Sequence, residues 1–267
     1  MHSTEFGRCG NVLHKGPSSR IRDIEWGGTF VADRVICVSK ALQQELHGLY
    51  GVPDKKMTTL YNGVDYRRFD VDVDTGGVRA KHAVGSDDPC VLFLGRLAWQ
   101  KGPDLLLETV PDILRRQSET KFVFVGDGEM RHSLQARAAD LGLFNSVRFT
   151  GQRRGLELIG LLKTADAVCV PSRNEPFGIV VLEAWSAARP VVVTRNGGPN
   201  EFVRDQDTGF MIHADCESIG RGLGTALSDT AKARKVGSNG RHEVESRFSW
   251  EAIAEGTEAV YDSLCGI

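Results

Sequence analysis

The sequence predicts an α/β fold built on a Rossmann-like parallel sheet, and three observations point to it. Apolar runs of strand length recur at 90–94, 121–125, 147–150, 167–170 and 191–194. Amphipathic segments such as 105–116 and 130–141 separate them, and polar or glycine-containing turns follow directly after the runs. Strands that alternate with helices form parallel sheets covered on both faces, so we expect this arrangement here.

The composition is that of an ordinary soluble globular protein. The chain has 267 residues, of which 41% are hydrophobic and 25% charged, enough for one complete core and part of a second. A net charge of −2 gives no support to nucleic-acid binding. The six cysteines form no C-x-x-C pair, and we find neither an apolar run of about 18 residues nor a signal-peptide pattern. We therefore expect reduced thiols in a cytoplasmic protein, with attachment to a membrane surface left open.

Shorter elements flank the sheet. Residues 66–89 are polar and rich in turn formers, and we interpret 73–89 as a linker between two domains. At the other end, Ser249 is suited to cap an amphipathic last helix.

The turn after the run 90–94 carries two cations, Arg96 and Lys101, just before a helix that begins near Pro103. Cations at this position oppose the helix dipole, at a cost of about 0.3–1 kcal/mol each, and a bound anion would reverse the sign. The alternative is that Asp104, in the first turn of the helix, neutralises them without a ligand.

Further polar or glycine positions follow the other runs, namely Asp127, Thr150, Gly151 and Gly197. In parallel sheets ligands bind beyond the carboxyl ends of the strands, so these positions are expected to meet in one crevice. The alternative for each is an ordinary turn between a strand and a helix.

The segment 171–184 is the most informative. Glu175 and Glu183 lie eight residues apart, separated by a Pro-Phe-Gly turn and an apolar helix start. Glu175 is predicted on the loop and Glu183 on the second turn of the helix. The helix N-terminus suits a diphosphate and the carboxylates suit hydroxyl groups, which predicts the ligand order sugar, diphosphate, ribose. The alternative is two solvated glutamates.

Five motifs resemble one family. E-P-F-G-I-V-V-L-E, G-R-L-A-W-Q-K-G, H-S-T-E, A-D-R-V-I-C-V-S and Y-N-G-V-D resemble retaining GT-B glycosyltransferases of the family 4 type, which include glycogen and sucrose synthases. The resemblance implies a remnant of the N-terminal Rossmann-like domain at 1–72, with most of that domain missing. Within this remnant it implies a strand at 30–39 and a turn at 61–65. It further implies a nucleotide-sugar domain at 90–248 and a C-terminal helix at 249–267 that crosses back to the first domain.

The resemblance also implies roles. His2 would approach the reacting sugar, Arg96 and Lys101 would stabilise the diphosphate, Glu175 would hold sugar hydroxyls and Glu183 the ribose, without a metal or other cofactor. The implied catalytic residues are His2, Arg96, Lys101 and Glu175. The implied donor site consists of Gly95, Arg96, Lys101, Asp127, Thr150, Gly151, Glu175, Pro176, Phe177, Gly178, Ile179 and Glu183.

The expected reaction is transfer of a hexosyl group, with glucosyl as the first choice, from a UDP- or ADP-sugar to a carbohydrate, lipid or small metabolite. Two alternatives remain, a non-catalytic donor-binding half that needs a partner and a nucleotide-sugar epimerase. We also expect self-association, because a shortened first domain would leave Trp250, Ile253 and Tyr261 of the last helix exposed.

Overall fold

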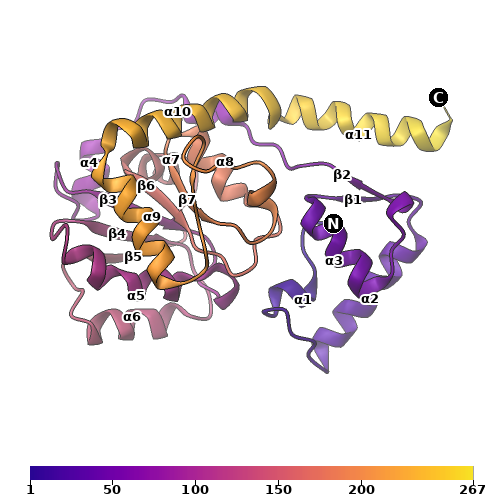
Figure 1. Ribbon diagram of the computed structural model, residues 1–267, viewed down its shortest axis with the longest axis horizontal. Helices are drawn as coiled ribbons and strands as arrows, with labels where there is room; N and C mark the ends of the chain where they lie inside the picture. The colour runs from indigo at the N-terminus through magenta and orange to yellow at the C-terminus, as the bar shows by residue number, and fades with distance from the viewer. Residues whose placement is uncertain (267) are drawn as a thin grey trace.

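The computed structural model describes residues 1–266, which form two parallel sheets (Figure 1). The larger sheet has the order β5-β4-β3-β6-β7-β8, and the smaller one pairs β1 with β2. The strands of the larger sheet are β3 (Cys90–Leu94), β4 (Lys121–Val125), β5 (Val147–Gly151), β6 (Ala167–Val170), β7 (Val191–Thr194) and β8 (Phe210–Ile212). The five strands predicted for it are confirmed, and β8 is an additional edge strand.

Helices cover both faces of the larger sheet. They are α4 (Thr75–Lys81), α5 (Pro103–Leu114), α6 (Arg131–Asp140), α7 (Gly155–Thr164), α8 (Ile179–Ser186), α9 (Cys216–Ser228) and α10 (Thr230–Arg247). Successive residues of β3 point to opposite faces of the sheet. Cys90 and Leu92 pack in the core between the sheet and helices α7 and α8. Val91 and Phe93 pack in the core between the sheet and helices α5, α6 and α9. Each large apolar side chain buried in this way contributes about 1.5–3 kcal/mol. The doubly covered parallel sheet is therefore confirmed.

The N-terminal unit consists of α1 (Glu5–Arg8), α2 (Pro17–Val31), β1 (Val35–Cys37), α3 (Lys40–Tyr50) and β2 (Met57–Thr59). The prediction of a strand over 30–39 is wrong at its start, because Phe30 and Val31 form the last turn of α2. The helix ends where Ala32 becomes extended, with φ −64° and ψ 142°. The strand came from the resemblance, and a short apolar run suits the end of a helix as well as a strand.

The segment interpreted as a linker is folded in part. Asp74 caps α4 by accepting a 2.9 Å hydrogen bond from the N–H of Gly77. Val73 and Val78 pack closely against Gly160 of α7, where a Cβ would lie 3.1 and 2.9 Å from their methyl carbons. Residues 73–81 of this segment therefore pack with the helical layer of the larger sheet.

The last helix, α11 (Trp250–Cys265), leaves the larger sheet and runs toward the N-terminal unit (Figure 1). As predicted, Ser249 caps it, accepting a hydrogen bond from the N–H of Ala252 at 3.2 Å. Trp250 and Tyr261 are exposed, as expected, whereas Ile253 is only half-exposed. Within residues 1–266 none of the helices combines the length and the apolar character that crossing a bilayer requires.

The cysteines differ in their surroundings. Cys37, Cys90 and Cys169 are buried in strands, and burial raises the pKa of all three thiols, that of Cys90 to about 12. Cys9 and Cys216 are partly buried, and Cys265 at the end of α11 is exposed.

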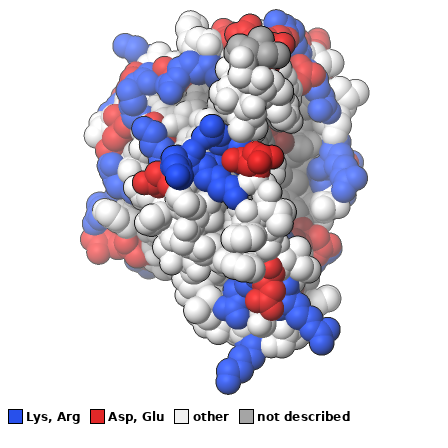
Figure 2. All heavy atoms as spheres, turned by 90° about the vertical axis from the view of Figure 1, so that its right-hand side faces the viewer, with Lys and Arg blue, Asp and Glu red and all other residues white. Residues whose placement is uncertain are grey.

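Charges of both signs share the face that carries the N-terminal unit. Figure 2 shows Lys and Arg side chains gathered near its centre, with Asp and Glu side chains beside them. This mixture agrees with the small net charge of the chain.

Candidate active site

A hollow opens where the N-terminal residues face the carboxyl ends of β3 and β6. These two strands are neighbours in the sheet, and the chain order reverses between them. Such a switch point is the usual ligand position of an open parallel sheet. The hollow is lined by His2, Ser3, Arg8, Asn62, Arg96, Gln100, Lys101, Glu175, Pro176, Phe177, Gly178 and Ile179.

The centre of the hollow is an ion pair between Lys101 and Glu175. The Nζ of Lys101 lies 2.9 and 2.7 Å from Oε1 and Oε2 of Glu175, and the hydroxyl of Ser172 donates to Oε2 at 2.9 Å. The Glu175 side chain is 8% exposed and that of Lys101 26%. The sequence placed these two residues in one site but did not predict that they bind each other.

The glycine loop after β7 fixes the backbone of Glu175. The N–H of Gly198 donates to the carbonyl of Glu175 at 2.8 Å, and Glu175 donates to the carbonyl of Asn196 at 3.3 Å. Gly197 has φ +93°, and a Cβ there would lie 2.1 Å from the carbonyl oxygen of Glu175. Only glycine fits this close approach.

Arg96 is exposed and makes no ion pair with any residue in the range 1–266; its Nη2 lies 3.3 Å from Oε1 of Gln100. The alternative that Asp104 neutralises Arg96 and Lys101 is wrong, because Asp104 receives two hydrogen bonds of 2.8 and 2.6 Å from Arg173. Arg173 in turn lies over the ring of Trp99, 4.6 Å from its centroid. Arg96 is therefore free to bind an anion.

The N-terminus of α8 faces the same hollow through Phe177, Gly178 and Ile179. Gly178 precedes the helix with φ +99°, a conformation that other residues rarely adopt. Glu183 lies on the second turn of α8, as predicted, but not among the residues that line the hollow. Burial raises the pKa of Glu183 to about 7, and the nearby Arg68 only partly opposes this rise.

His2 lines the hollow from the opposite side and is exposed. Partial burial, followed by the charge of the terminal amine, lowers the pKa of its imidazole. The structure therefore brings together the four residues predicted to be catalytic, namely His2, Arg96, Lys101 and Glu175.

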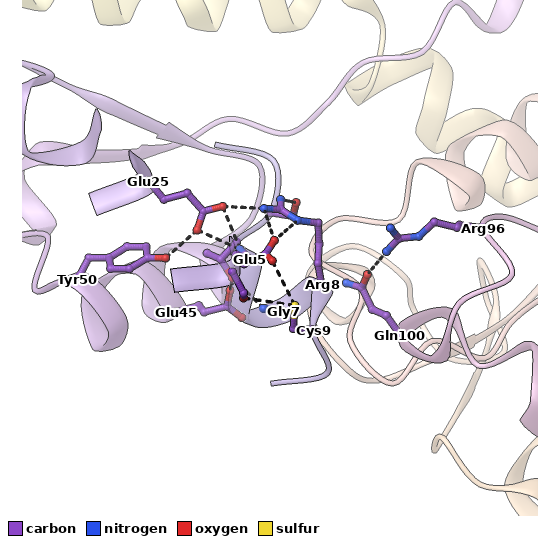
Figure 3. A network of polar contacts seen from close by, with 12 residues as sticks. Glu5, Gly7, Arg8, Cys9, Glu25, Glu45, Tyr50, Arg96 and Gln100 are labelled. Atoms are coloured by element: carbon purple, nitrogen blue, oxygen red, sulfur yellow. Dashed lines mark hydrogen bonds and ion pairs between the residues drawn. The ribbon is translucent and has the colours of Figure 1, made fainter. Parts of the chain in front are cut away.

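Glu5, the last residue of H-S-T-E, belongs to a polar network of the N-terminal unit (Figure 3). Arg8 donates to Glu5 at 3.2 and 3.1 Å and to Glu25 at 2.8 Å, and the hydroxyl of Tyr50 donates to Glu25 at 2.7 Å. Arg8 thus borders the hollow with its charge largely compensated. Sequence reasoning missed Arg8 and Asn62, although both lie inside or directly beside motifs that it recognised.

The remaining predicted donor residues lie at strand ends outside the lining of the hollow. Asp127 accepts 2.8 Å hydrogen bonds from the N–H of Gly128 and from Arg131, and the Thr150 hydroxyl donates to the carbonyl of Gly151 at 2.9 Å. Gly95 and Gly151 are likewise outside it. Their contacts to a donor stay predictions. No three His, Cys, Asp or Glu side chains in the described part of the chain are arranged to hold a metal ion.

Two family models match the chain. The model described as Glycosyl transferases group 1 matches residues 76–243, and the model described as Glycosyltransferase Family 4 matches residues 1–68. The two matches together include every residue that lines the hollow.

Individual proteins agree with the family models. An uncharacterized glycosyltransferase of Methanocaldococcus jannaschii is 37% identical over 98% of this chain and 67% of its own length. Glycogen synthase of Mycobacterium tuberculosis is 28% identical over 98% of this chain, which spans only 61% of that enzyme. The crystal structure of Anabaena HepE with UDP-glucose superimposes with a TM-score of 0.79 at 26% identity, over 88% of this chain and 64% of that one.

Proposed function

The chain belongs to the group 1 glycosyl transferases, a family with the GT-B fold, and on this premise we propose that it transfers a hexosyl group from a nucleoside diphosphate sugar with retention at the anomeric carbon. The proposed sugar is glucose, and the proposed nucleotide is UDP or ADP. The acceptor is a carbohydrate, a lipid or a small metabolite, and the reaction requires no metal. HepE, which binds UDP-glucose, supports a donor of this kind.

The observation that carries the proposal is the grouping of Arg96, Lys101 and the N-terminus of α8 around one hollow, with His2 opposite. Two cations and a helix N-terminus suit a diphosphate, because each favours negative charge. When the bond to the sugar breaks, the charge on the departing diphosphate grows. Groups already in place to receive that charge accelerate this step electrostatically.

The Lys101–Glu175 pair gives the proposed site two states. Without a donor, Glu175 compensates the charge of Lys101. When a diphosphate takes over part of that role, Glu175 gains acceptor capacity for sugar hydroxyls while the hydroxyl of Ser172 still donates to it. Glu183 would hold the ribose, and Thr150 with Gly151 would contact the base.

A donor-binding protein that needs a partner for turnover is the second candidate. This chain spans 61–67% of the length of the relatives described above. Such a protein would bind the donor through the same residues and transfer nothing alone.

Calorimetric titration with UDP, ADP and GDP and with their glucose conjugates tests the proposal, followed by measurement of released nucleotide. We expect saturable binding of one nucleotide, weakened in Arg96→Ala by about 1.5–3 kcal/mol. Arg115→Ala is the matched control, since Arg115 is an exposed arginine that pairs with Asp112 on α5, outside the lining of the hollow. Absence of binding by every nucleotide, or equal affinity in Arg96→Ala and the wild type, would refute the site. Binding without release would favour the second candidate.

A further inference from the structure

The N-terminus of α3 is attached to the loops of the larger sheet by side chains from both units. Glu201 ends the short 3-10 helix η4 (Gly198–Glu201) of the glycine loop. Its two carboxylate oxygens accept hydrogen bonds from the first N–H groups of α3, that of Lys40 at 3.0 Å and that of Ala41 at 2.8 Å. The hydroxyl of Tyr61 donates to the same carboxylate at 3.2 Å.

This attachment is favourable for a physical reason. The first N–H groups of a helix have no partner inside the helix, and its N-terminus carries a partial positive charge. A carboxylate from another element satisfies both needs at once. Glu201 forms no ion pair in the described chain, so the N-terminus of α3 is its main electrostatic partner.

A second bond joins the same place to the candidate active site. Ser39, the N-cap of α3, accepts from the N–H of Leu42 and donates its hydroxyl proton to the carbonyl of Pro176 at 2.6 Å. Pro176 directly follows Glu175, and Gly198, three residues before Glu201, donates to the carbonyl of Glu175. The N-terminus of α3 is thus bonded to both loops that hold Glu175.

The opposite end of this connection leads to His2. Thr4 donates its hydroxyl proton to Glu45 on α3, and Met1 packs against the cores of both units. The segment that carries His2 is therefore bonded to α3 through Thr4, and the N-terminus of α3 is bonded to Glu201.

We propose that Glu201 is a positioning residue, which docks the N-terminus of α3 onto the glycine loop so that His2 faces Lys101 and Glu175. It does not touch the donor. This inference rests on the proposed function for its effect on turnover, but the docking itself is independent of any reaction.

The test compares Glu201→Ala with Asp205→Ala. Asp205 lies in the same loop region and pairs with Arg195 without contacting α3, so it controls for loss of a carboxylate. A third variant, Lys40→Pro, removes the backbone N–H of residue 40, which donates a hydrogen bond to Glu201. Residue 40 is the first residue of α3, a helical position at which proline is tolerated. The extended backbone of Ser39 is also compatible with a following proline.

Three quantities are measured on the full chain. They are amide hydrogen exchange of residues 39, 41 and 42, which keep their N–H groups in every variant, affinity for UDP, or for ADP if the wild type binds that nucleotide instead, and release of the bound nucleotide from its glucose conjugate. In Glu201→Ala and Lys40→Pro we expect faster exchange, unchanged affinity for UDP and turnover reduced by about tenfold or more, because small misplacements of catalytic groups are costly. Asp205→Ala should behave as the wild type. Unchanged exchange in Glu201→Ala, unchanged turnover, or an equal loss in Asp205→Ala would overturn the proposal.

The two proposals fail separately. If the wild type binds none of UDP, ADP and GDP, the proposed function fails, while the exchange of residues 39, 41 and 42 still decides whether Glu201 docks α3. If UDP binds and is released but exchange is the same in all variants, the docking role fails alone.

Discussion

Removing Lys101 should destabilise the fold much more than neutralising Glu175. Lys101→Met leaves the carboxylate of Glu175, whose side chain is 8% exposed, with the hydroxyl of Ser172 as its remaining side-chain partner. An uncompensated buried charge costs about 3–5 kcal/mol, and the partial exposure of the Lys101 side chain, 26%, favours the lower end, about 3 kcal/mol. Glu175→Gln leaves an ammonium group that can reach water, so about 1 kcal/mol is expected.

Urea unfolding at pH 7 measures both variants and the double variant, in which the penalty of the unpaired carboxylate should disappear. The matched control is Lys81→Met, which breaks the exposed pair of Lys81 with Glu157 and should cost less than about 1 kcal/mol. The reasoning is refuted if Lys101→Met costs no more than Lys81→Met, or if the two single variants of the buried pair cost the same.

Three further predictions concern the same region. Glu175→Gln should leave the affinity for UDP intact, since Lys101 becomes free for the diphosphate, and should weaken UDP-glucose by about 1.5 kcal/mol in calorimetry, because a hydroxyl acceptor loses its charge. Burial raises the pKa of Glu183 from 4.5 to about 7, so the folded state retains a proton that the unfolded state has lost. Stability should therefore fall by roughly 3 kcal/mol as the pH rises through that interval, and unfolding of Glu183→Gln at pH 5 and pH 8 should show this fall abolished. Gly197→Ala should destabilise the protein more than Gly142→Ala in thermal unfolding: both glycines have positive φ, but a Cβ on Gly142 meets nothing within 4 Å, whereas one on Gly197 meets the backbone of Glu175. Equal losses would mean that the loop relaxes without strain.

The sequence predicted five of the six strands of the larger sheet and the end of the sheet on which the hollow lies. Both depend on local patterns, since strand and helix periodicities are visible within each segment and ligands lie beyond the carboxyl ends of parallel strands. For the same reason Glu175 and Glu183 are found on the loop and on the second helical turn that their spacing predicted.

The pairing of charges could not be predicted in this way. Lys101 and Glu175 are 74 residues apart, and Asp104 and Arg173 are 69 residues apart. Only the packing of β3 against β6 decides which cation meets which carboxylate. The alternative in which Asp104 neutralises Arg96 and Lys101 is wrong for the same reason, because Asp104 pairs with Arg173 on the loop after β6.

The helix at 75–81 could not be predicted from the composition of that segment. Thr75, Gly76 and Gly77 are typical of a turn, and isolated propensity disfavours a helix there. The cap from Asp74 and the packing of Val78 on α7 outweigh that preference. Tertiary contacts of this kind are invisible in a single sequence.

The different surroundings of the cysteines have a practical consequence for labelling this protein. Thiol-labelling reagents react with the thiolate, which is the nucleophile, and the buried strand cysteines, with raised pKa values, rarely form a thiolate near neutral pH. Of the six cysteines, all within the described residues, Cys265 alone is exposed. It is the last residue of α11, and Figure 1 shows the C-terminal end of that helix at the edge of the molecule. A fluorophore or spin label attached there would follow the orientation of α11 in the unmodified sequence, without an engineered attachment point.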